Sequence, residues 1–373
     1  MKSYIVIGSG ILGASTAYHL ATSGAQVTLI DRKDRGQATE AAAGIVCPWL
    51  TQRRNKAWYF LAKNGAKYYP DLIRRLEQDG ETETGYSRVG AISLHHDHSK
   101  LEKMVERAKK RREDAPEIGD ITLLSHTETR SMFPPLSDEY AAVHVSGGAR
   151  VNGQALRDAL IRAAEKHGAV IHNGDAKLIR EENEVTGVEV NGNLIEADQV
   201  IVTAGAWAKE LFEPFDIELM VRPQKAQIVH LDMPNVDTAN WPVVMPPNNQ
   251  YLLSFGGGKV VIGATHEDDV GYDMRPTVGG IHDILHKALT IAPGLSKCTV
   301  VETKVGFRPF TPGFLPVIGS LPSFNNMLFA NGLGASGLTV GPYLGSELAN
   351  LALGEPLEID MNDYDVREAI KLM

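Results

Sequence analysis

The chain has 373 residues, 43% of them hydrophobic, and a formal net charge of −9 at pH 7. This length suffices for a large core spread over two or three domains. The acidic balance disfavours nucleic acid or an anionic membrane surface as the main partner. The two cysteines, Cys47 and Cys298, form no CxxC pair and are too few for a disulfide framework. We therefore expect a reducing compartment.

The first elements along the chain form a strand–turn–helix–strand unit. Residues 3–8 (SYIVIG) are a short apolar run typical of a buried parallel strand. A glycine-rich turn follows, then a helix over about 12–23 and a second strand over 26–31 that ends in an acid. Because this pattern continues directly into further elements, we interpret it as a βαβ start and not as a signal peptide. No other apolar run reaches the length of a membrane span, so we expect a cytoplasmic protein without an integral membrane segment.

The rest of the chain alternates between helical and strand patterns. Residues 256–258 are three glycines between two apolar runs and predict the turn of an antiparallel hairpin. In chain order the predicted elements are helix 55–79, strand 88–95, helix 98–114, helix 153–168, strands 169–172, 176–180, 185–190, 199–203, 221–231, 250–255 and 259–264, helix 277–291, strand 327–330 and helix 338–353.

These elements predict an α/β fold with two domains. Glycine-rich signatures occur at the N-terminus, near residue 205 and near residues 332–337. One Rossmann-type nucleotide-binding domain assembled from separate segments would bring them together. We expect the second domain to contain a mostly antiparallel sheet. The predicted boundaries are 1–80, 145–215 and 300–373 for the nucleotide-binding domain, and 81–144 and 216–299 for the second domain.

The N-terminal turn, GSGILG, has the G-x-G-x-x-G pattern of a dinucleotide site. Gly8 permits the tight turn, Gly10 lets a pyrophosphate approach the backbone, and Gly13 lets the helix pack on the strand. Phosphates would lie at the helix N-terminus, beside Ile11 and Leu12. A glycine-rich turn in some other α/β protein is the alternative, but strand, motif, helix, strand and acid all occur in order.

The acid at the end of the second strand is Asp31, 23 positions after Gly8. This spacing suits a carboxylate that accepts hydrogen bonds from a ribose diol. Arg32 follows directly and, with Asp31, could also suggest a site for a 2′-phosphate. Asp31 would repel that phosphate, so we favour the ribose diol.

Three further stretches of small residues indicate which dinucleotide binds. ATEAAAGIV (38–46), VIVTAGAW (200–207) and FANGLGASGLTVG (329–341) are spread over the chain, and together they fit one long ligand such as FAD. The N-terminus of the last helix could point its positive end at the flavin pyrimidine oxygen. Tight packing is the alternative for each stretch taken alone. The candidate FAD-binding residues here are Thr39, Ala42, Ala43, Gly44, Ile45, Ala176, Ala204, Gly205, Trp207, Gly332, Gly334, Ala335, Ser336, Gly337 and Leu338.

With these motifs, the chain resembles the D-amino-acid oxidase superfamily, in particular its glycine oxidase and D-amino-acid dehydrogenase branch. The stretches VVIGATHE (260–267) and VGFRPFTPGFLPVIG (305–319) carry the resemblance together with the glycine motifs above. The resemblance implies an FAD domain, a substrate domain with a larger β-sheet, and oxidation of an amine to an imine. The substrate would transfer a hydride from Cα to flavin N5, and the imine would then hydrolyse.

Three residues are candidates for substrate binding. Arg308 stands alone in an apolar, glycine- and proline-rich stretch, where an unpaired guanidinium would be costly. From the residues alone, a buried ion pair and a substrate carboxylate explain it equally well; the resemblance implies the carboxylate. It also implies that Tyr251 helps to hold the carboxylate, the alternative being a hairpin aromatic packed on the sheet. His266 is either a substrate contact or a histidine at the end of a strand.

The chain also departs from its relatives. Ala335 stands where glycine oxidases often carry another arginine, and Asp31 replaces a more usual glutamate. Residues 302–316 contain no cysteine and Cys298 lies upstream, so we expect non-covalent FAD. Cys47 follows a small-residue stretch and could face the flavin, but a buried, inert thiol is favoured. We expect no metal site, because the HHDH run (95–98) lacks partner ligands at helical spacing.

The sequence leaves more than one function open. We favour FAD-dependent oxidation of glycine, a small D-amino acid or an N-substituted amino acid. The second hypothesis is a flavin-binding subunit of an electron-transfer complex without its own turnover, and the third is an NAD-dependent Rossmann dehydrogenase. The sequence does not determine the substrate side chain, its chirality, the electron acceptor or whether the chain forms a homo-oligomer.

Overall fold

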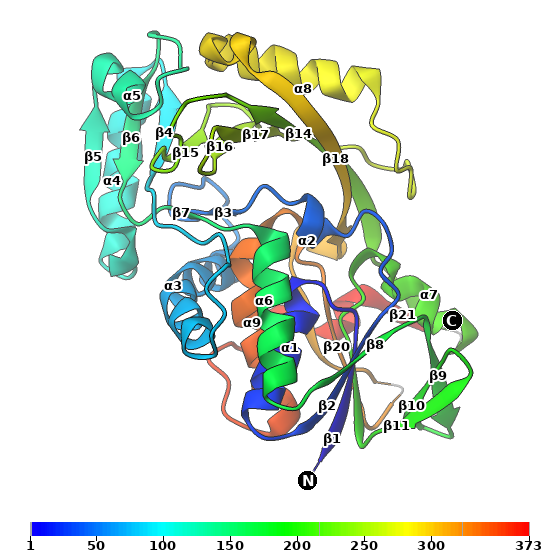
Figure 1. Cartoon of the computed structure of the whole chain (residues 1–373). Coiled ribbons are helices and arrows are strands. Elements are labelled where there is room, and N and C mark those ends of the chain that lie inside the picture. Colours follow the sequence, from blue (N-terminus) through cyan, green and yellow to red (C-terminus); the bar gives the residue numbers. More distant parts are fainter. Residues whose placement is uncertain (1, 216, 323, 373) are drawn as a thin grey trace.

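The computed structural model describes residues 2–215, 217–322 and 324–372. Its two largest sheets lie one above the other in Figure 1. The lower sheet has six strands, all parallel except β19 at one edge. Its order is β19 (Val317–Ser320), β20 (Met327–Asn331), β12 (Gln199–Val202), β1 (Ser3–Ile7), β2 (Gln26–Asp31) and β8 (Val170–Asn173).

Helices and a small sheet cover opposite faces of the six-stranded sheet. Along β1, Tyr4 and Val6 join a core cluster with the helices, whereas Ile5 and Ile7 join a cluster with the small sheet. Strands buried on both faces explain the continuous apolar runs in the sequence. The helices are α1 (Ile11–Thr22), α3 (Lys56–Gln78), α6 (Gly153–Lys166) and α9 (Gly337–Leu353), and the small sheet consists of β9 (Ala176–Glu181), β10 (Glu184–Val190) and β11 (Asn193–Glu196).

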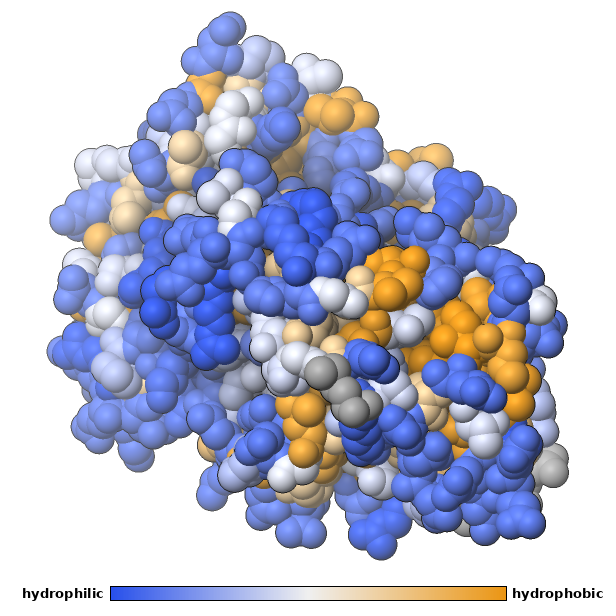
Figure 2. All heavy atoms as spheres, turned by 60° about the horizontal axis from the view of Figure 1, so that its bottom comes forward, coloured by the Kyte–Doolittle hydropathy of each residue, from blue (hydrophilic) through white to orange (hydrophobic). Residues whose placement is uncertain are grey.

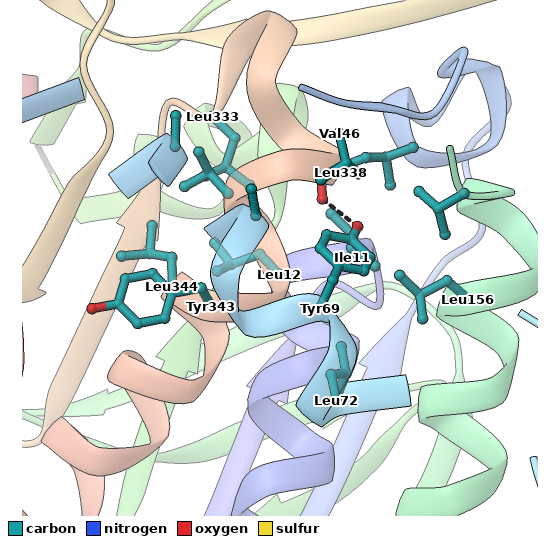
Figure 3. Close-up of a cluster of buried hydrophobic side chains, with 14 of the residues drawn as sticks. Ile11, Leu12, Val46, Tyr69, Leu72, Leu156, Leu333, Leu338, Tyr343 and Leu344 are labelled. Carbon is teal, nitrogen blue, oxygen red and sulfur yellow. Dashed lines mark hydrogen bonds between the residues drawn. The ribbon is translucent and has the colours of Figure 1, made fainter. Parts of the chain in front are cut away.

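Leucine and tyrosine side chains join these helices into one core, part of which is drawn in Figure 3. Leu12 of α1, Leu72 of α3, Leu156 of α6 and Leu344 of α9 are all buried there. The hydroxyl of Tyr69 donates a hydrogen bond to the carbonyl of Leu338, in the first turn of α9. The core therefore fixes the N-termini of α1 and α9, which both face the site described below.

The upper sheet has eight strands and is antiparallel except where β15 pairs with β4. Helix α4 (His98–Arg112) packs near one end of this sheet and α8 (Val278–Ile291) packs on β14 and β17. The strand order is β18 (Thr299–Phe310), β14 (Arg222–Asp232), β17 (Lys259–Gly263), β16 (Tyr251–Ser254), β15 (Val243–Met245), β4 (Ala91–His95), β6 (Ala141–Val145) and β5 (Ile121–Leu124).

The remaining short elements complete the chain. They are α2 (Ala38–Ala41), α5 (His126–Met132) and α7 (Ala208–Phe212), and the paired strands β3 (Ile45–Val46) with β7 (Ala149–Arg150) and β13 (Ile217–Leu219) with β21 (Ile370–Leu372).

The predicted α/β fold class is confirmed, but β18 was not predicted. It pairs with β14 over the whole range from Arg222 to Asp232 and forms one edge of the eight-stranded sheet. Its glycine and its one proline concealed the strand pattern; Pro309 is tolerated because an edge strand has one unpaired side. The predicted boundary at residue 300 therefore separates β18 from the sheet to which it belongs. The division into two domains otherwise stays our proposal, with residues 300–310 moved to the substrate domain.

β18 also touches the six-stranded half of the molecule. The amide of Phe307 donates a 2.9 Å hydrogen bond to the carbonyl of Gly36, and Phe307 forms an isolated bridge with Gln37. One strand is therefore hydrogen-bonded both to the eight-stranded sheet and to the segment that follows β2. A side chain on this part of β18 is held by both halves.

Hydrophilic residues dominate the face in Figure 2, which is interrupted by smaller hydrophobic areas. This is the usual surface composition of a charged globular chain. Within the part of the chain that the structure describes, no helix has the length and apolarity needed to cross a membrane.

We predict that Gly13→Ala destabilises the fold, because a Cβ there would lie 1.8 Å from the carbonyl oxygen of Gly8. Such overpacking typically costs about 1–3 kcal/mol. Gly279→Ala in α8 is the control: a Cβ there meets no atom within 4 Å, and alanine favours a helix by about 1 kcal/mol over glycine. Thermal unfolding of the FAD-loaded variants should show a lower Tm for the first substitution and no decrease for the second. Equal melting temperatures would contradict this packing role.

Candidate active site

A cavity of about 1220 Å³ connects the two halves of the chain. At one end it is lined by residues at the carboxyl ends of β1, β2, β12 and β20, and at the other by residues of β16 and β18. Ligands of open α/β sheets bind at the carboxyl ends of the strands. The volume exceeds the 300–1,000 Å³ or so typical of sites for drug-sized ligands, so the cavity has room for a long dinucleotide together with a small substrate.

The glycines of the first turn have the geometry that the motif requires. Gly8 has a φ of +100°, a left-handed value that favours glycine. A Cβ on Gly10 would meet only the Thr39 hydroxyl, at 3.5 Å, so the backbone is open toward the cavity. Gly10, Ile11 and Leu12 line the cavity, whereas Gly13 lies behind them between helix and strand. The N-terminus of α1 therefore faces the cavity, as expected for a phosphate site.

Asp31 lines the cavity at the end of β2. Its carboxylate accepts hydrogen bonds from the amides of Ser9 (2.6 Å) and Lys33 (2.5 Å) and from Nε2 of Gln37 (3.0 Å). A carboxylate can accept about four hydrogen bonds, so one further donor, such as a ribose hydroxyl, can be accommodated. We call this part of the cavity the Asp31 end.

Arg32 also lines the cavity, but three carboxylates surround it. Its guanidinium pairs with Asp34, with Asp175 at 3.1 Å and with Glu210 at 2.6 Å. Burial alone would lower the pKa of this guanidinium, but the hydrogen bonds that it donates to the three carboxylates reverse the effect and raise the pKa. A cation engaged in this way is not available for a 2′-phosphate, which agrees with the ribose-diol interpretation.

The other small-residue stretches converge on the same cavity. Gly332 is an exception: a Cβ there would lie 2.0 Å from the Thr311 hydroxyl, so this glycine serves close packing. Like Gly13, it does not line the cavity. The predicted residues that do line it are Thr39, Ala42, Ala43, Gly44, Ile45, Ala176, Ala204, Gly205, Trp207, Gly334, Ala335, Ser336, Gly337 and Leu338.

Arg308 lies on β18 at the opposite end of the cavity. Nη1 donates a 3.2 Å hydrogen bond to Oε1 of Gln224 on β14. Among the described residues, no Asp or Glu lies within ion-pairing distance of Arg308, so the alternative of a structural ion pair is wrong for this part of the chain. Burial lowers the pKa of the guanidinium. Because an unpaired buried charge is costly, this position favours binding of an anion.

Tyr251 and His266 lie beside Arg308 and line the same part of the cavity. Burial raises the pKa of the Tyr251 hydroxyl to about 12, and the charge of Arg308 acts in the opposite direction. The hydroxyl therefore keeps its proton at neutral pH and can donate to an anion. Burial and then the charge of Arg308 lower the pKa of His266, so this imidazole is neutral at pH 7. We call the region of these three residues the Arg308 end.

Some residues of the Arg308 end were not predicted. His95, the first residue of the HHDH run and the last of β4, lines the cavity. The polar side chains of Gln52, Asn248 and Asn249 also line it. They belong to irregular segments without a motif: Gln52 lies between β3 and α3, and Asn248 and Asn249 lie between β15 and β16.

Cys47 lies in the cavity wall as a buried thiol. Burial raises its pKa to about 12, so the thiol is protonated at neutral pH. Since the thiolate is the reactive form, Cys47 has the inert character that we favoured.

Comparisons with known proteins agree with this geometry. The family model described as FAD dependent oxidoreductase (DAO) matches residues 3–351. The chain is 62% identical over 371 residues to the "Uncharacterized oxidoreductase YurR" of Bacillus subtilis (strain 168), covering 99% of this chain and 100% of that protein. It is 28% identical over 365 residues to the glycine oxidase of Pseudomonas aeruginosa (strain PAO1), covering 96% and 97% of the two proteins.

A solved structure extends the similarity to the fold. Iminodiacetate oxidase (IdaA) from Chelativorans sp. BNC1 matches with a TM-score of 0.94 and 45% identity, covering 97% of this chain and 98% of that one. The family match covers both the glycine turn of the Asp31 end and the arginine of the Arg308 end. The chain belongs to the DAO family of FAD-dependent oxidoreductases.

Proposed function

We propose that this protein oxidises a small amino acid with FAD as the electron acceptor, giving an imine that hydrolyses. The substrate would be glycine, a D-amino acid or an N-substituted amino acid. The observation that carries the proposal is the half-buried guanidinium of Arg308, which faces the cavity without a carboxylate partner among the described residues. An α-carboxylate is the anion that every such substrate provides.

The cavity fits FAD along its length. The N-terminus of α1 and Asp31 would hold the pyrophosphate and a ribose, and the glycine loop that begins α9 would face the flavin. When bound, FAD supplies the acceptor for a hydride from the substrate Cα. Cys47 is the cysteine that lines the cavity, and its thiol is protonated at neutral pH. We therefore propose that FAD is bound non-covalently.

The residues of the Arg308 end would orient the substrate. The planar guanidinium of Arg308 can bind a carboxylate through two parallel hydrogen bonds, and the Tyr251 hydroxyl can donate a third. Neutral His266 borders the same space without adding a charge at pH 7. Fixing one end of a small substrate directs its Cα, and such positioning can lower a barrier by up to roughly 7–11 kcal/mol. No acid–base pair is required for this step.

The charges that line the cavity favour substrates with one or two carboxylates. Within the described chain, the lining acids belong to the Asp31 end, whereas the guanidinium of Arg308 is the charge of the other end; these acids are Asp31, Asp34, Asp175, Glu189 and Glu210. The name of the solved relative, iminodiacetate oxidase, describes a secondary amine with two carboxylates. We therefore include N-carboxymethyl amino acids among the N-substituted substrates.

The alternative is a flavin-binding subunit without its own amino-acid turnover. In such a subunit the Arg308 end would have no substrate to bind, and an arginine buried without a carboxylate partner would only destabilise the fold. Because the Arg308 end has room for a substrate carboxylate, we favour an enzyme over an electron-transfer subunit. The NAD-dependent dehydrogenase is set aside, because the family is FAD-dependent.

We predict that an amino acid reduces the flavin directly. The purified protein, kept free of oxygen, is mixed with glycine, sarcosine, iminodiacetate, L- and D-proline and a set of D-amino acids, one at a time. Loss of the visible flavin absorption with at least one of them supports the enzyme, and admission of air then distinguishes an oxidase from a dehydrogenase. A yellow protein that none of these amines reduces would favour the electron-transfer subunit.

We predict that Arg308→Ala lowers kcat/KM by about 30- to 1000-fold, equivalent to about 2–4 kcal/mol for a lost charged partner. FAD content should not change, since Arg308 lies on β18 and belongs neither to the glycine turns nor to the end of β2 that carries Asp31. Arg367→Ala is the matched control, because Arg367 is exposed and pairs with Asp365. Steady-state kinetics and the absorption ratio of flavin to protein measure the two effects. An unchanged kcat/KM at low substrate would refute the carboxylate assignment.

We predict that acid precipitation releases all of the flavin into the supernatant, because no reactive thiolate is available in the cavity wall. The measurement is the absorption of the supernatant compared with that of the pellet. Flavin that stays with the pellet would show that the attachment is covalent.

A further inference from the structure

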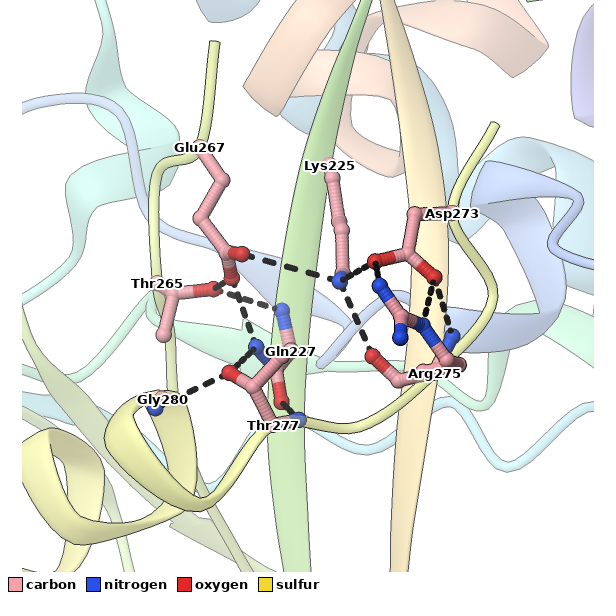
Figure 4. A network of polar contacts seen from close by, with 8 residues as sticks. All are labelled: Lys225, Gln227, Thr265, Glu267, Asp273, Arg275, Thr277 and Gly280. Atoms are coloured by element: carbon pink, nitrogen blue, oxygen red, sulfur yellow. Dashed lines mark hydrogen bonds and ion pairs between the residues drawn. The ribbon is translucent and has the colours of Figure 1, made fainter. Parts of the chain in front are cut away.

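The segment between β17 and α8, residues 264–277, forms a strap that is fixed to β14 (Figure 4). Lys225 of β14 is buried, and its ammonium group lies 3.6 Å from the Glu267 carboxylate and 3.4 Å from the Asp273 carboxylate. It also donates to the carbonyl of Arg275 at 2.9 Å. The buried amide of Gln227 donates to Glu267 at 2.7 Å and to the hydroxyl of Thr277 at 3.0 Å. These contacts determine where the strap lies along the strand.

The strap also reaches the half of the chain that carries the glycine turns. The hydroxyl of Tyr272 donates a 2.5 Å hydrogen bond to the carbonyl of Ala206. Its ring stacks on Trp207, with centroids 5.4 Å apart and an angle of 12° between the rings. Trp207 lines the cavity. The position of the strap is therefore set from both halves.

Gln224 of β14 links this strap to Arg308. Its Oε1 accepts the 3.2 Å hydrogen bond from Nη1 of Arg308, and its Nε2 donates a 2.9 Å hydrogen bond to Oδ1 of Asp268 in the strap. A guanidinium offers only donors and a carboxylate only acceptors. The two neighbours therefore fix which way the amide points, an assignment that is otherwise ambiguous. Gln224 is buried, does not line the cavity, and lies opposite Arg308 in the β14–β18 ladder.

We propose that Gln224, held by Asp268, is the positioning residue that points Arg308 at the substrate carboxylate; this inference rests on the proposed function. A neutral amide restrains the guanidinium without neutralising it. A glutamate of the same size would form an internal ion pair and compete with the substrate. The negative charge of Asp268 is separated from Arg308 by the side chain of Gln224. From there Asp268 orients the Gln224 amide and makes the amide oxygen a stronger acceptor for Arg308.

Binding of a carboxylate that cannot be oxidised tests this role directly. Acetate, with neutral acetamide as its isostere, is titrated into the FAD-loaded protein, and the shift of the visible flavin spectrum gives Kd. Gln224→Leu should raise the Kd for acetate about 3- to 10-fold, the effect of one lost hydrogen bond. Gln224→Glu should raise it by more than about 30-fold, because the new carboxylate occupies Arg308. Asp268→Asn, which keeps an acceptor for the amide, should stay within about threefold, and Asp268→Ala should resemble Gln224→Leu.

The Gln224→Leu variant is the decisive readout, because leucine fills a similar volume but cannot accept the hydrogen bond from Arg308. If Gln224 only filled space, the leucine variant would bind acetate nearly as well as wild type. That result, or equal Kd values for all variants, would overturn the proposal. Gln78→Glu, at the exposed end of α3, is the matched charge control and should not change Kd. FAD content and Tm confirm folding.

Two further variants keep the test decisive. If Gln224→Glu yields no folded flavoprotein, then Gln224→Asn, whose shorter amide does not reach Arg308, should raise Kd together with Asp268→Ala, and unchanged values would refute the proposal. Arg308→Met separates this inference from the proposed function. If Arg308→Met binds acetate as tightly as wild type does, the assignment of the carboxylate site to Arg308 is wrong. If it alone loses acetate, Arg308 is the site but Gln224 does not position it.

Discussion

A half-buried positive charge that lines the cavity without a negative partner among the described residues is the constraint on which this active site depends. Arg308 makes a 3.2 Å hydrogen bond to a neutral amide and, among the described residues, has no carboxylate within ion-pairing distance. Leaving a buried charge uncompensated lowers stability, so the fold must supply that free energy elsewhere. Gln224 of β14 lies opposite Arg308 in the ladder that joins β14 and β18. The ladder holds the backbone of β18 in place beneath the guanidinium. A substrate carboxylate can then form the ion pair with Arg308 that no carboxylate of the described chain forms.

The position of β18 determines where this charge can act. Phe307, next to Arg308, is hydrogen-bonded to Gly36, just after the strand that carries Asp31. The aromatic contacts of Tyr272 with Trp207 and Phe307 add a second connection between the same two regions. The distance between the dinucleotide site and the carboxylate site is therefore fixed by short-range backbone and aromatic contacts. A reaction in which Cα must lie close to the flavin requires such a fixed distance.

The sequence predicted local features well and long-range pairing poorly. Gly8, Gly10, Gly13 and Asp31 lie within 24 residues, so strand, turn and helix rules suffice to interpret them. β18 contains Gly306 and Pro309 and begins with exposed residues, so neither composition nor alternation marks it as a strand, and only its pairing with β14 reveals it. Nothing in the sequence around Gln224 indicates a role in the site, because that role depends on the pairing of β14 with β18, which places Arg308 opposite Gln224. The roles of Gly13 and Gly332 in packing likewise depend on backbone atoms that the motif does not specify.

The charged side chains at the Asp31 end are paired or hydrogen-bonded within the protein, whereas the Arg308 guanidinium has no carboxylate partner among the described residues. We infer that this difference determines which way the dinucleotide and the substrate lie in the cavity. At the Asp31 end, Arg32 is paired with three carboxylates, and Asp31 accepts hydrogen bonds from two backbone amides and from Gln37. The pyrophosphate there is left to the uncharged N-terminus of α1, which provides N–H groups at no cost in ion pairing. At the Arg308 end an amide takes the place of a carboxylate, so the cation keeps its full charge for the substrate. A dinucleotide bound in the reverse orientation would place its pyrophosphate away from the N-terminus of α1 and would gain little binding energy. A small carboxylate would bind strongly only at Arg308, where the positive charge has no partner.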